Sequence, residues 1–149
     1  MVEVFQRCRS REIPDAFLTV LAEGWTSVFE QLQRAGRGIV CELEEIEVSL
    51  LDDDEMARVH GEFLDDPTPT DVITFDHGEL LIGVETAGRQ ALEYRGSLEA
   101  EIALYGIHGL LHLSGFDDRE KSEAQVMEER QDEIFREVFE PVLRDRQFF

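Results

Sequence analysis

The chain has 149 residues, and its 34 acidic side chains against 14 lysines and arginines give a net charge of -20. This charge disfavours a broad nucleic-acid surface, because phosphate binding depends on Lys and Arg. All of the basic residues except Lys121 are arginines, whose guanidinium groups suit phosphate, which leaves room for a local Arg patch. With 42% hydrophobic and 32% charged residues, the composition predicts a soluble globular protein with one domain over residues 1–149.

The cysteines and the lengths of the apolar segments indicate the cellular compartment of the protein. Cys8 and Cys41 are too few and too far apart for a disulfide framework, and both are expected as buried free thiols in strands. No stretch approaches the roughly 20 apolar residues that a membrane span needs. We therefore expect a cytoplasmic protein that does not bind a membrane.

The first part of the chain alternates strand and helix patterns. Val2 to Cys8 predicts a strand at the edge of a sheet, and a helix is expected from Pro14 to Gly36, where apolar residues recur every three or four positions. Period-two alternation predicts one long strand from Ile39 to Leu51. Asp52 to Asp54 then has the form of a capped helix start, although three consecutive carboxylates also allow a bound cation.

The middle of the chain contains two short strand patterns after a loop. Asp65 to Thr70 is rich in proline and predicts a loop. The runs Asp71 to Phe75 and Glu79 to Gly83 follow, and the glycine between them favours a hairpin, with a parallel arrangement as the alternative. His77 near this turn and His60 on the preceding helix are expected in solvent.

Three helices are predicted in the last part of the chain. A modest helix covers Thr86 to Tyr94, and Ser122 begins a capping-box pattern that opens a final helix ending before Pro141. Between them, Ser97 is a suitable N-cap for a helix that is apolar nearly all round and therefore buried at the centre of the domain. In total, three to four strands and four to five helices indicate an α+β fold.

Two glycines and two histidines stand out on the central helix. Gly106 and Gly109 each lower helix stability by about 1 kcal/mol, which indicates close approach of another backbone or a ligand. His108 and His112 lie four residues apart, on one helix face, where two imidazoles can share a metal ion. The alternative is a pair of core histidines with satisfied hydrogen bonds.

A third ligand for such a metal follows the helix. Gly115 allows the chain to reverse, which would bring Asp118 back to the two histidines. Two imidazoles and one carboxylate suit zinc, with the fourth position left for water. The sequence therefore predicts a His108, His112 and Asp118 metal site.

The same residues carry a resemblance to a known family. His108 to Asp118, HGLLHLSGFDD, resembles the HGxLHLxGYDH signature of the YbeY family of bacterial endoribonucleases, which are rRNA maturation factors. Thr70 to Phe75, TDVITF, is similar to the family's TDVLSF motif, and Glu79 to Gly83 resembles its GDI strand. The resemblance implies a small mixed sheet packed with helices, and a zinc ion held by three histidines in a cleft.

This sequence departs from the family pattern at the third ligand. By position, His108 and His112 are the first two ligands, and Asp118 stands where the family has its third histidine. A carboxylate adds negative charge and lowers the Lewis acidity of the site, which moves the metal preference towards Mn or Fe or raises the pKa of a bound water. Zinc remains the expected ion.

Further site residues are candidates by resemblance or proximity. The family places an arginine in a segment resembling Met56 to Asp66, where no residue aligns cleanly, so Arg58 and Arg89 are candidates for the phosphate contact. Asp117 or Glu101 is the candidate for orienting a ligand or shuttling a proton. Asp117 is alternatively a loop cap, and Glu101 lies two helical turns before the first histidine.

The function expected from these features is a metal-dependent, single-strand-specific endoribonuclease in rRNA maturation and ribosome quality control. Its partners would be rRNA precursors or single-stranded RNA, together with the ribosome or ribosomal proteins. Gly109 stands where HExxH zinc proteases have their general base, which disfavours peptide hydrolysis by that mechanism. The alternatives are a metallohydrolase of another substrate class and a ribosome-associated binding protein with a structural metal.

Overall fold

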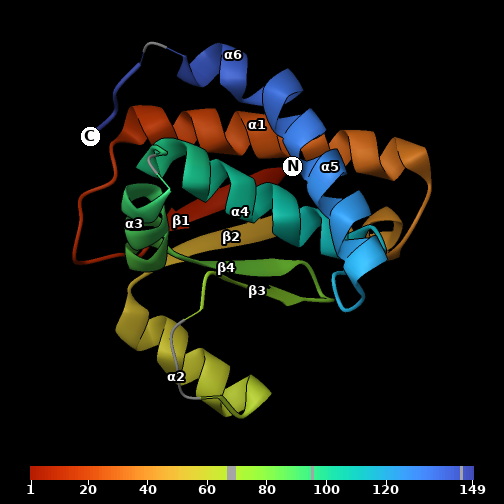
Figure 1. The fold of residues 1–149 in the computed structure, drawn as a ribbon, viewed down its shortest axis with the longest axis horizontal. Helices are drawn as coiled ribbons and strands as arrows, with labels where there is room; N and C mark the ends of the chain where they lie inside the picture. The colour runs from red at the N-terminus through yellow and green to blue at the C-terminus, as the bar shows by residue number, and fades with distance from the viewer. Residues whose placement is uncertain (67–69, 95, 145) are drawn as a thin grey trace.

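A four-stranded mixed sheet lies at the centre of the computed structural model, which describes residues 1–66, 70–94, 96–144 and 146–149 (Figure 1). The sheet order is β1-β2-β4-β3, with β1, β2 and β4 parallel and β3 antiparallel to β4. The expected edge position of the first strand is therefore confirmed, and the two short strands form a hairpin. The strands are β1 (Val2–Gln6), β2 (Ile46–Leu51), β3 (Val72–Phe75) and β4 (Glu79–Gly83).

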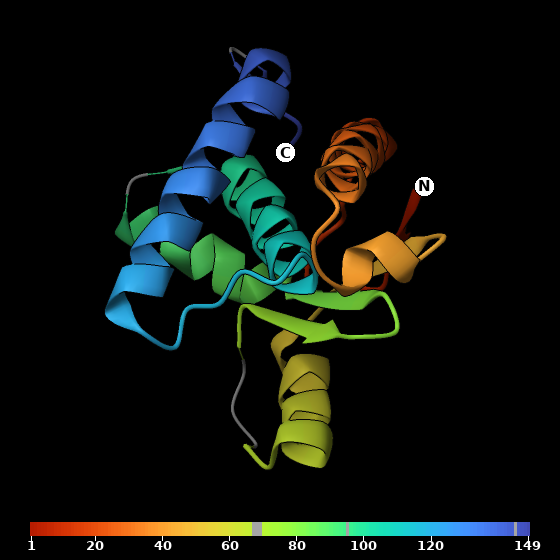
Figure 2. The same cartoon turned by 90° about the vertical axis from the view of Figure 1, so that its right-hand side faces the viewer.

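Helices cover both faces of this sheet (Figure 2). α1 and α4 lie on one face and α2 lies on the other, while α5 packs across the outer side of α4. This arrangement confirms the predicted α+β class. The helices are α1 (Asp15–Ala35), α2 (Asp53–Leu64), α3 (Val84–Glu93), α4 (Leu98–Leu113), α5 (Lys121–Val138) and α6 (Glu140–Leu143).

The main core fills the space between the sheet and the α1 and α4 layer. It joins residues from both ends of the chain, from Val2 to Phe139, and Trp25 lies at its centre with no exposed surface. A smaller cluster under α2 covers the other face of the sheet. None of the described helices is both long and apolar enough to cross a bilayer.

α4 is buried on most sides, and its two glycines allow close contacts with side chains, where the sequence predicts a backbone or a ligand. A Cβ at Gly106 would overlap the indole ring of Trp25, which donates a hydrogen bond from Nε1 to the carbonyl oxygen of Ala103 at 3.1 Å. A Cβ at Gly109 would lie 2.5 Å from Cδ2 of Leu80 on β4. α4 therefore sits closer to both α1 and the sheet than a helix with larger residues could.

The segment from Ile39 to Leu51 is not one long strand. Ile39–Glu42 forms a short 3₁₀ helix, and strand β2 begins only at Ile46. The side chain of Gln33 on α1 donates to the carbonyl oxygen of Leu43 at 2.8 Å and to that of Val40 at 3.3 Å, so these carbonyls bond outside the sheet. As a consequence Cys41 is exposed, contrary to the prediction, whereas Cys8 is buried.

Asp52 stands at the N-cap position of α2, but its side chain bonds elsewhere. Its carboxylate accepts hydrogen bonds from the backbone N–H groups of Arg9 (2.7 Å) and Ser10 (3.1 Å), from the Ser10 hydroxyl (2.6 Å) and from the Cys8 thiol (3.0 Å). Partial burial raises the pKa of the Asp52 carboxyl, but these hydrogen bonds outweigh it and hold the pKa well below its usual range. Asp52 thus ties the segment after β1 to the start of α2.

Three predicted boundaries differ from the structure. The helix expected from Thr86 begins at Val84, directly after β4, and α5 begins at Lys121, so Ser122 lies inside its first turn. The strand predicted from Val2 to Cys8 ends at Gln6. The final predicted helix, in contrast, ends at Val138, before Pro141 as predicted, and Pro141 lies in the separate helix α6. Part of the loop predicted from Asp65 to Thr70, residues 67–69, lies outside the described residues.

Candidate metal centre

α4 and the turn that follows it place the candidate ligands. Ser97 caps the helix by accepting a hydrogen bond from the N–H of Ala100 at 3.0 Å, as predicted. At the other end Gly115 adopts φ +93°, its N–H donates to the His112 carbonyl, and the N–H of Phe116 donates to the Leu111 carbonyl. This is the hydrogen-bond pattern of a Schellman motif, which reverses the chain.

The reversal brings the three predicted ligands together. The Nε2 atoms of His108 and His112 are 3.1 Å apart, with the ring planes at 84°. Oδ2 of Asp118 lies 3.6 Å and 3.8 Å from these two nitrogens. Two nitrogens that each bind one zinc ion at about 2.0–2.1 Å in tetrahedral geometry are about 3.3 Å apart, so the observed spacing fits a shared ion.

The hydrogen bonding of His112 shows which nitrogen is free to bind. Its Nδ1 lies 3.1 Å from the backbone carbonyl oxygen of Phe116, which can only accept, so Nδ1 carries the hydrogen. The Nε2 lone pair of the neutral ring then faces Nε2 of His108 and the carboxylate of Asp118. The two Nε2 atoms and a carboxylate oxygen of Asp118 all lie within 4.8 Å of one another, and this donor set fits a metal ion.

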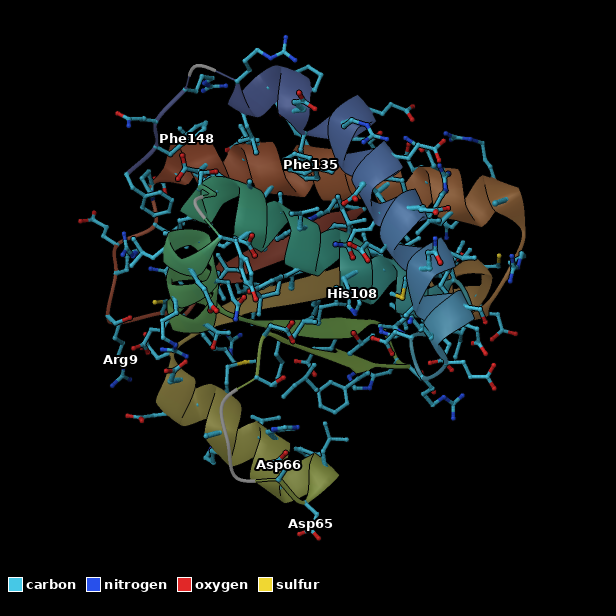
Figure 3. All side chains as sticks on the ribbon, in the orientation of Figure 1. Arg9, Asp65, Asp66, His108, Phe135 and Phe148 are labelled. Atoms are coloured by element: carbon cyan, nitrogen blue, oxygen red, sulfur yellow. The ribbon has the colours of Figure 1, made fainter. Side chains whose placement is uncertain are left out.

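The ligands lie at one side of a cleft of about 530 Å³ between the end of α4 and strand β3. Figure 3 shows His108 on α4, the helix that α5 contacts. Four carboxylates line the cleft, and none of its described lining residues is Lys or Arg. The lining residues are Leu64, Asp71, Val72, Ile73, Thr74, Asp76, His108, His112, Leu113, Gly115, Phe116, Asp117 and Asp118.

Asp117 caps the turn after α4 and also lines the cleft. Its Oδ1 accepts hydrogen bonds from the N–H groups of Asp118 (2.7 Å) and Arg119 (3.2 Å), as a loop cap does. Oδ2 binds the guanidinium of Arg119 at 2.6 Å, and this hydrogen bond is the main cause that lowers the pKa of the Asp117 carboxyl. Because it also lines the cleft, Asp117 presents an ionised carboxylate there.

Glu101 lies outside the set of residues that line the cleft. It is half-buried, and burial is the main cause that raises the pKa of its carboxyl, opposed by a hydrogen bond from Tyr105. Burial also raises the pKa of the Tyr105 hydroxyl. The structure thus places Glu101 in a polar cluster with Tyr105, near Asp71, and away from the three ligands.

The two candidate arginines are held by carboxylates elsewhere. Arg58 binds Glu55 at 2.6 Å and Glu62 at 2.8 Å, and it lines a second cavity of about 890 Å³ on the α2 side of the sheet. Arg89 binds Asp53 at 2.8 Å. Neither is among the described residues that line the cleft beside His108.

One residue of the site escaped the sequence reasoning. Gln131 of α5 places Oε1 2.9 Å from Nδ1 of His108. The available signal was its position between Met127 and Ile134, which are buried on the same face of α5, since a polar residue within an apolar stripe needs a partner.

The fold and these side chains together define an α+β protein with a His-His-Asp group, spaced to hold a metal ion, beside an acidic cleft. A family model for Endoribonuclease YbeY matches residues 6–138. An Endoribonuclease YbeY of Heliobacterium modesticaldum is 32% identical over 137 residues, covering 74% of this chain and 82% of the relative, and one of Chlamydia trachomatis serovar D is 35% identical over 121 residues, covering 68% and 75%. The chain belongs to the YbeY endoribonuclease family.

A solved structure supports the fold alone. The solution structure of TM1509 from Thermotoga maritima aligns with a TM-score of 0.62 and 23% identity, covering 92% of this chain and 91% of that one. The sheet and helix arrangement is therefore one that a protein of similar length also adopts.

Proposed function

We propose that this protein is a metal-dependent, single-strand-specific endoribonuclease that acts on rRNA precursors in rRNA maturation and ribosome quality control. Membership of a family whose relatives are named endoribonucleases supports the reaction class. The observation that carries the proposal is the convergence of His108, His112 and Asp118 beside a cleft. In this proposal residues 1–149 act as one domain in the cytoplasm, with the ribosome or ribosomal proteins as partners.

The proposed cofactor is one zinc ion with three protein ligands and water. When bound, zinc supplies Lewis-acid chemistry at a phosphoryl oxygen and makes a water molecule more acidic. His108 and His112 would bind it through imidazole nitrogens, and a carboxylate ligand from Asp118 would lower the net charge of the site by one relative to three histidines. Mn and Fe are the alternatives, because a carboxylate with two imidazoles also suits these ions.

An open coordination position favours an enzyme over a structural metal. Structural zinc sites almost always have four protein ligands, whereas catalytic sites have three and leave one position for water or substrate. The described residues offer three donors at this point, and Asp118 and both histidines are partly exposed. The cleft therefore gives a substrate access to the fourth position.

The acidic cleft sets how RNA is held in this proposal. Four carboxylates repel a phosphodiester, so the ion must provide much of the attraction within the cleft. The guanidinium of Arg119, bound to Asp117, adds positive charge beside it. Asp117 is ionised at neutral pH and is the proposed residue for orienting water or accepting a proton. Arg58 is left out, because two glutamates of α2 hold it on the other side of the sheet.

The test measures metal content and cleavage side by side. The variants His112→Ala and Asp118→Ala are compared with wild type, and His77→Ala serves as the control because His77 is exposed in the β3–β4 turn. Bound zinc is measured by elemental analysis, and cleavage is measured on a single-stranded RNA and on an rRNA precursor. We expect both site variants to lose zinc and cleavage, and the control to keep both.

Two results would contradict the proposal in different ways. If either site variant binds zinc as wild type does, the ligand assignment is wrong. If zinc is lost but rRNA cleavage persists, the metal does not take part in the reaction. If wild type binds zinc but cleaves neither RNA, the alternative of a binding protein with a structural metal gains support.

A further inference from the structure

Gln131 connects α5 to the candidate metal centre from a part of the chain 23 residues away. Its side chain is half-buried where α5 packs on α4, and Oε1 lies 2.9 Å from Nδ1 of His108. At this distance the amide oxygen accepts a hydrogen bond from the ring N–H. Figure 1 shows α5 crossing α4 towards the end that carries the ligands.

We infer that Gln131 is a positioning residue that holds His108 as the Nδ1–H tautomer, with the Nε2 lone pair directed at the metal. A neutral imidazole has one N–H and one lone pair, and the partner of one nitrogen decides the state of the other. The inference rests on the proposed metal site, and it assigns to α5 a part in building that site.

The opposite tautomer would close the site. With the hydrogen on Nε2, His108 would donate it to Nε2 of His112, which lies 3.1 Å away and has a free lone pair because its own Nδ1 donates to Phe116. This hydrogen bond would occupy the Nε2 atoms of both histidines, and neither would have a lone pair free for a metal ion. The amide oxygen of Gln131 disfavours this arrangement. With the hydrogen on Nε2, the lone pair of Nδ1 would face the lone pairs of Oε1 at 2.9 Å, whereas a hydrogen on Nδ1 is donated to that oxygen.

His108 and His112 are thus fixed by acceptors of different origin. The acceptor for His112 is a backbone carbonyl, which no substitution removes, whereas the acceptor for His108 is a side chain of another helix. An amide also adds no charge beside a cleft that already has four carboxylates. Gln131 therefore provides the one of these two acceptors that a substitution can remove, and a variant at this position tests the tautomer of His108 directly.

The first test needs no variant and no RNA. Nitrogen NMR of the histidine rings, recorded on metal-free protein at alkaline pH where the rings are neutral, separates protonated from unprotonated nitrogens. We expect His108 to show a hydrogen on Nδ1 and a lone pair on Nε2. A hydrogen on Nε2 of His108 in the wild type would overturn the inference.

The second test uses variants with zinc affinity as the readout. Gln131→Leu removes the acceptor, and we expect a mixture of His108 tautomers and zinc binding weakened about 10- to 100-fold. Gln131→Glu keeps an acceptor, so the tautomer should be that of wild type. Gln125→Leu is the control, since Gln125 lies exposed on the same helix and bonds only Glu129 among the described residues.

The outcomes separate this inference from the proposed function. If Gln131→Leu keeps both the wild-type tautomer and the wild-type zinc affinity, Gln131 does not position His108. If the leucine variant fails to fold, the tautomers of wild type and Gln131→Glu still decide the question. Zinc binding and tautomer as expected, with no RNA cleavage by wild type, would refute the proposed function and leave the inference standing.

Discussion

Gly106 offers a sharp test of how tightly the central helix is packed. In Gly106→Ala the new methyl group would overlap three atoms of the Trp25 indole, which is fully buried. The ring has little freedom to move, because Nε1 is bonded to the carbonyl of Ala103 and Phe139 lies against it with ring centroids 6.4 Å apart. The substitution therefore forces either α1 or α4 to shift.

Two opposing terms set the expected size of the effect. Replacing glycine by alanine inside a helix stabilises it by about 1 kcal/mol. Overpacking a close-packed core costs about 1–3 kcal/mol, and a fully buried ring places this site near the upper end of that range. We expect Gly106→Ala to lower the free energy of unfolding by about 2 kcal/mol, the difference between about 3 and about 1 kcal/mol.

A second glycine provides the matched control. Gly88 lies inside α3, and a Cβ there meets no described atom within 4 Å. Gly88→Ala should therefore show the helix term alone and stabilise the protein by about 0.5–1 kcal/mol. Urea unfolding followed by circular dichroism measures both variants. Our account of the α1–α4 contact is refuted if Gly106→Ala is as stable as Gly88→Ala.

Three other predictions concern pH and metal. The pKa of Asp52 is lowered in the folded state, so its contribution to stability is present above the unfolded value of about 4 and is lost as pH falls through the folded value. Urea unfolding should show Asp52→Asn less stable than wild type at pH 7, with a smaller gap at pH 3; a constant gap would contradict this. Burial raises the pKa of Glu101, so ionisation destabilises the folded state as pH rises through that raised value. Glu101→Gln should accordingly be more stable than wild type at pH 8 and equal to it at pH 4, and a less stable variant at pH 8 would be inconsistent with this reasoning. Zinc at a hundred times its dissociation constant should stabilise wild type by about 2.7 kcal/mol, seen as a rise in melting temperature, and should leave His112→Ala unchanged.

The sequence by itself determined the parts of the site that depend on neighbouring residues. The spacing of His108 and His112 places them on one face of any helix, and Ser97 and Gly115 mark where that helix begins and ends. The reversal at Gly115 is also local, since its hydrogen bonds join residues that are at most five positions apart. For this reason the grouping of the three side chains was predictable, including that of Asp118.

Alternation of apolar residues was a weaker guide where a distant side chain competes for backbone groups. From Ile39 to Leu51 the pattern predicts one strand, yet Gln33 takes the carbonyl of Leu43 and the strand starts at Ile46. Asp52 likewise has the composition of a helix cap, but the N–H groups of a segment 42 and 43 residues earlier bind its carboxylate. Propensity could not reveal these partners. Asp52 meets the N–H groups of Arg9 and Ser10 only when β1 and β2 pair, and Gln33 meets Leu43 only when the segment after α1 folds back on that helix.

Only the tertiary structure decided what surrounds the ligands. The packing of α5 on α4 brings Gln131 to His108. The packing of α2 decides that Arg58 lies on the other side of the sheet from His108. The four cleft carboxylates come from the β3 region and the turn after α4, which lie some forty residues apart in sequence. Helical periodicity and chain reversal act within a few residues, so the grouping of His108, His112 and Asp118 follows from the sequence. The hydrogen bond between His108 and Gln131 and the charge of the cleft depend on contacts between distant segments.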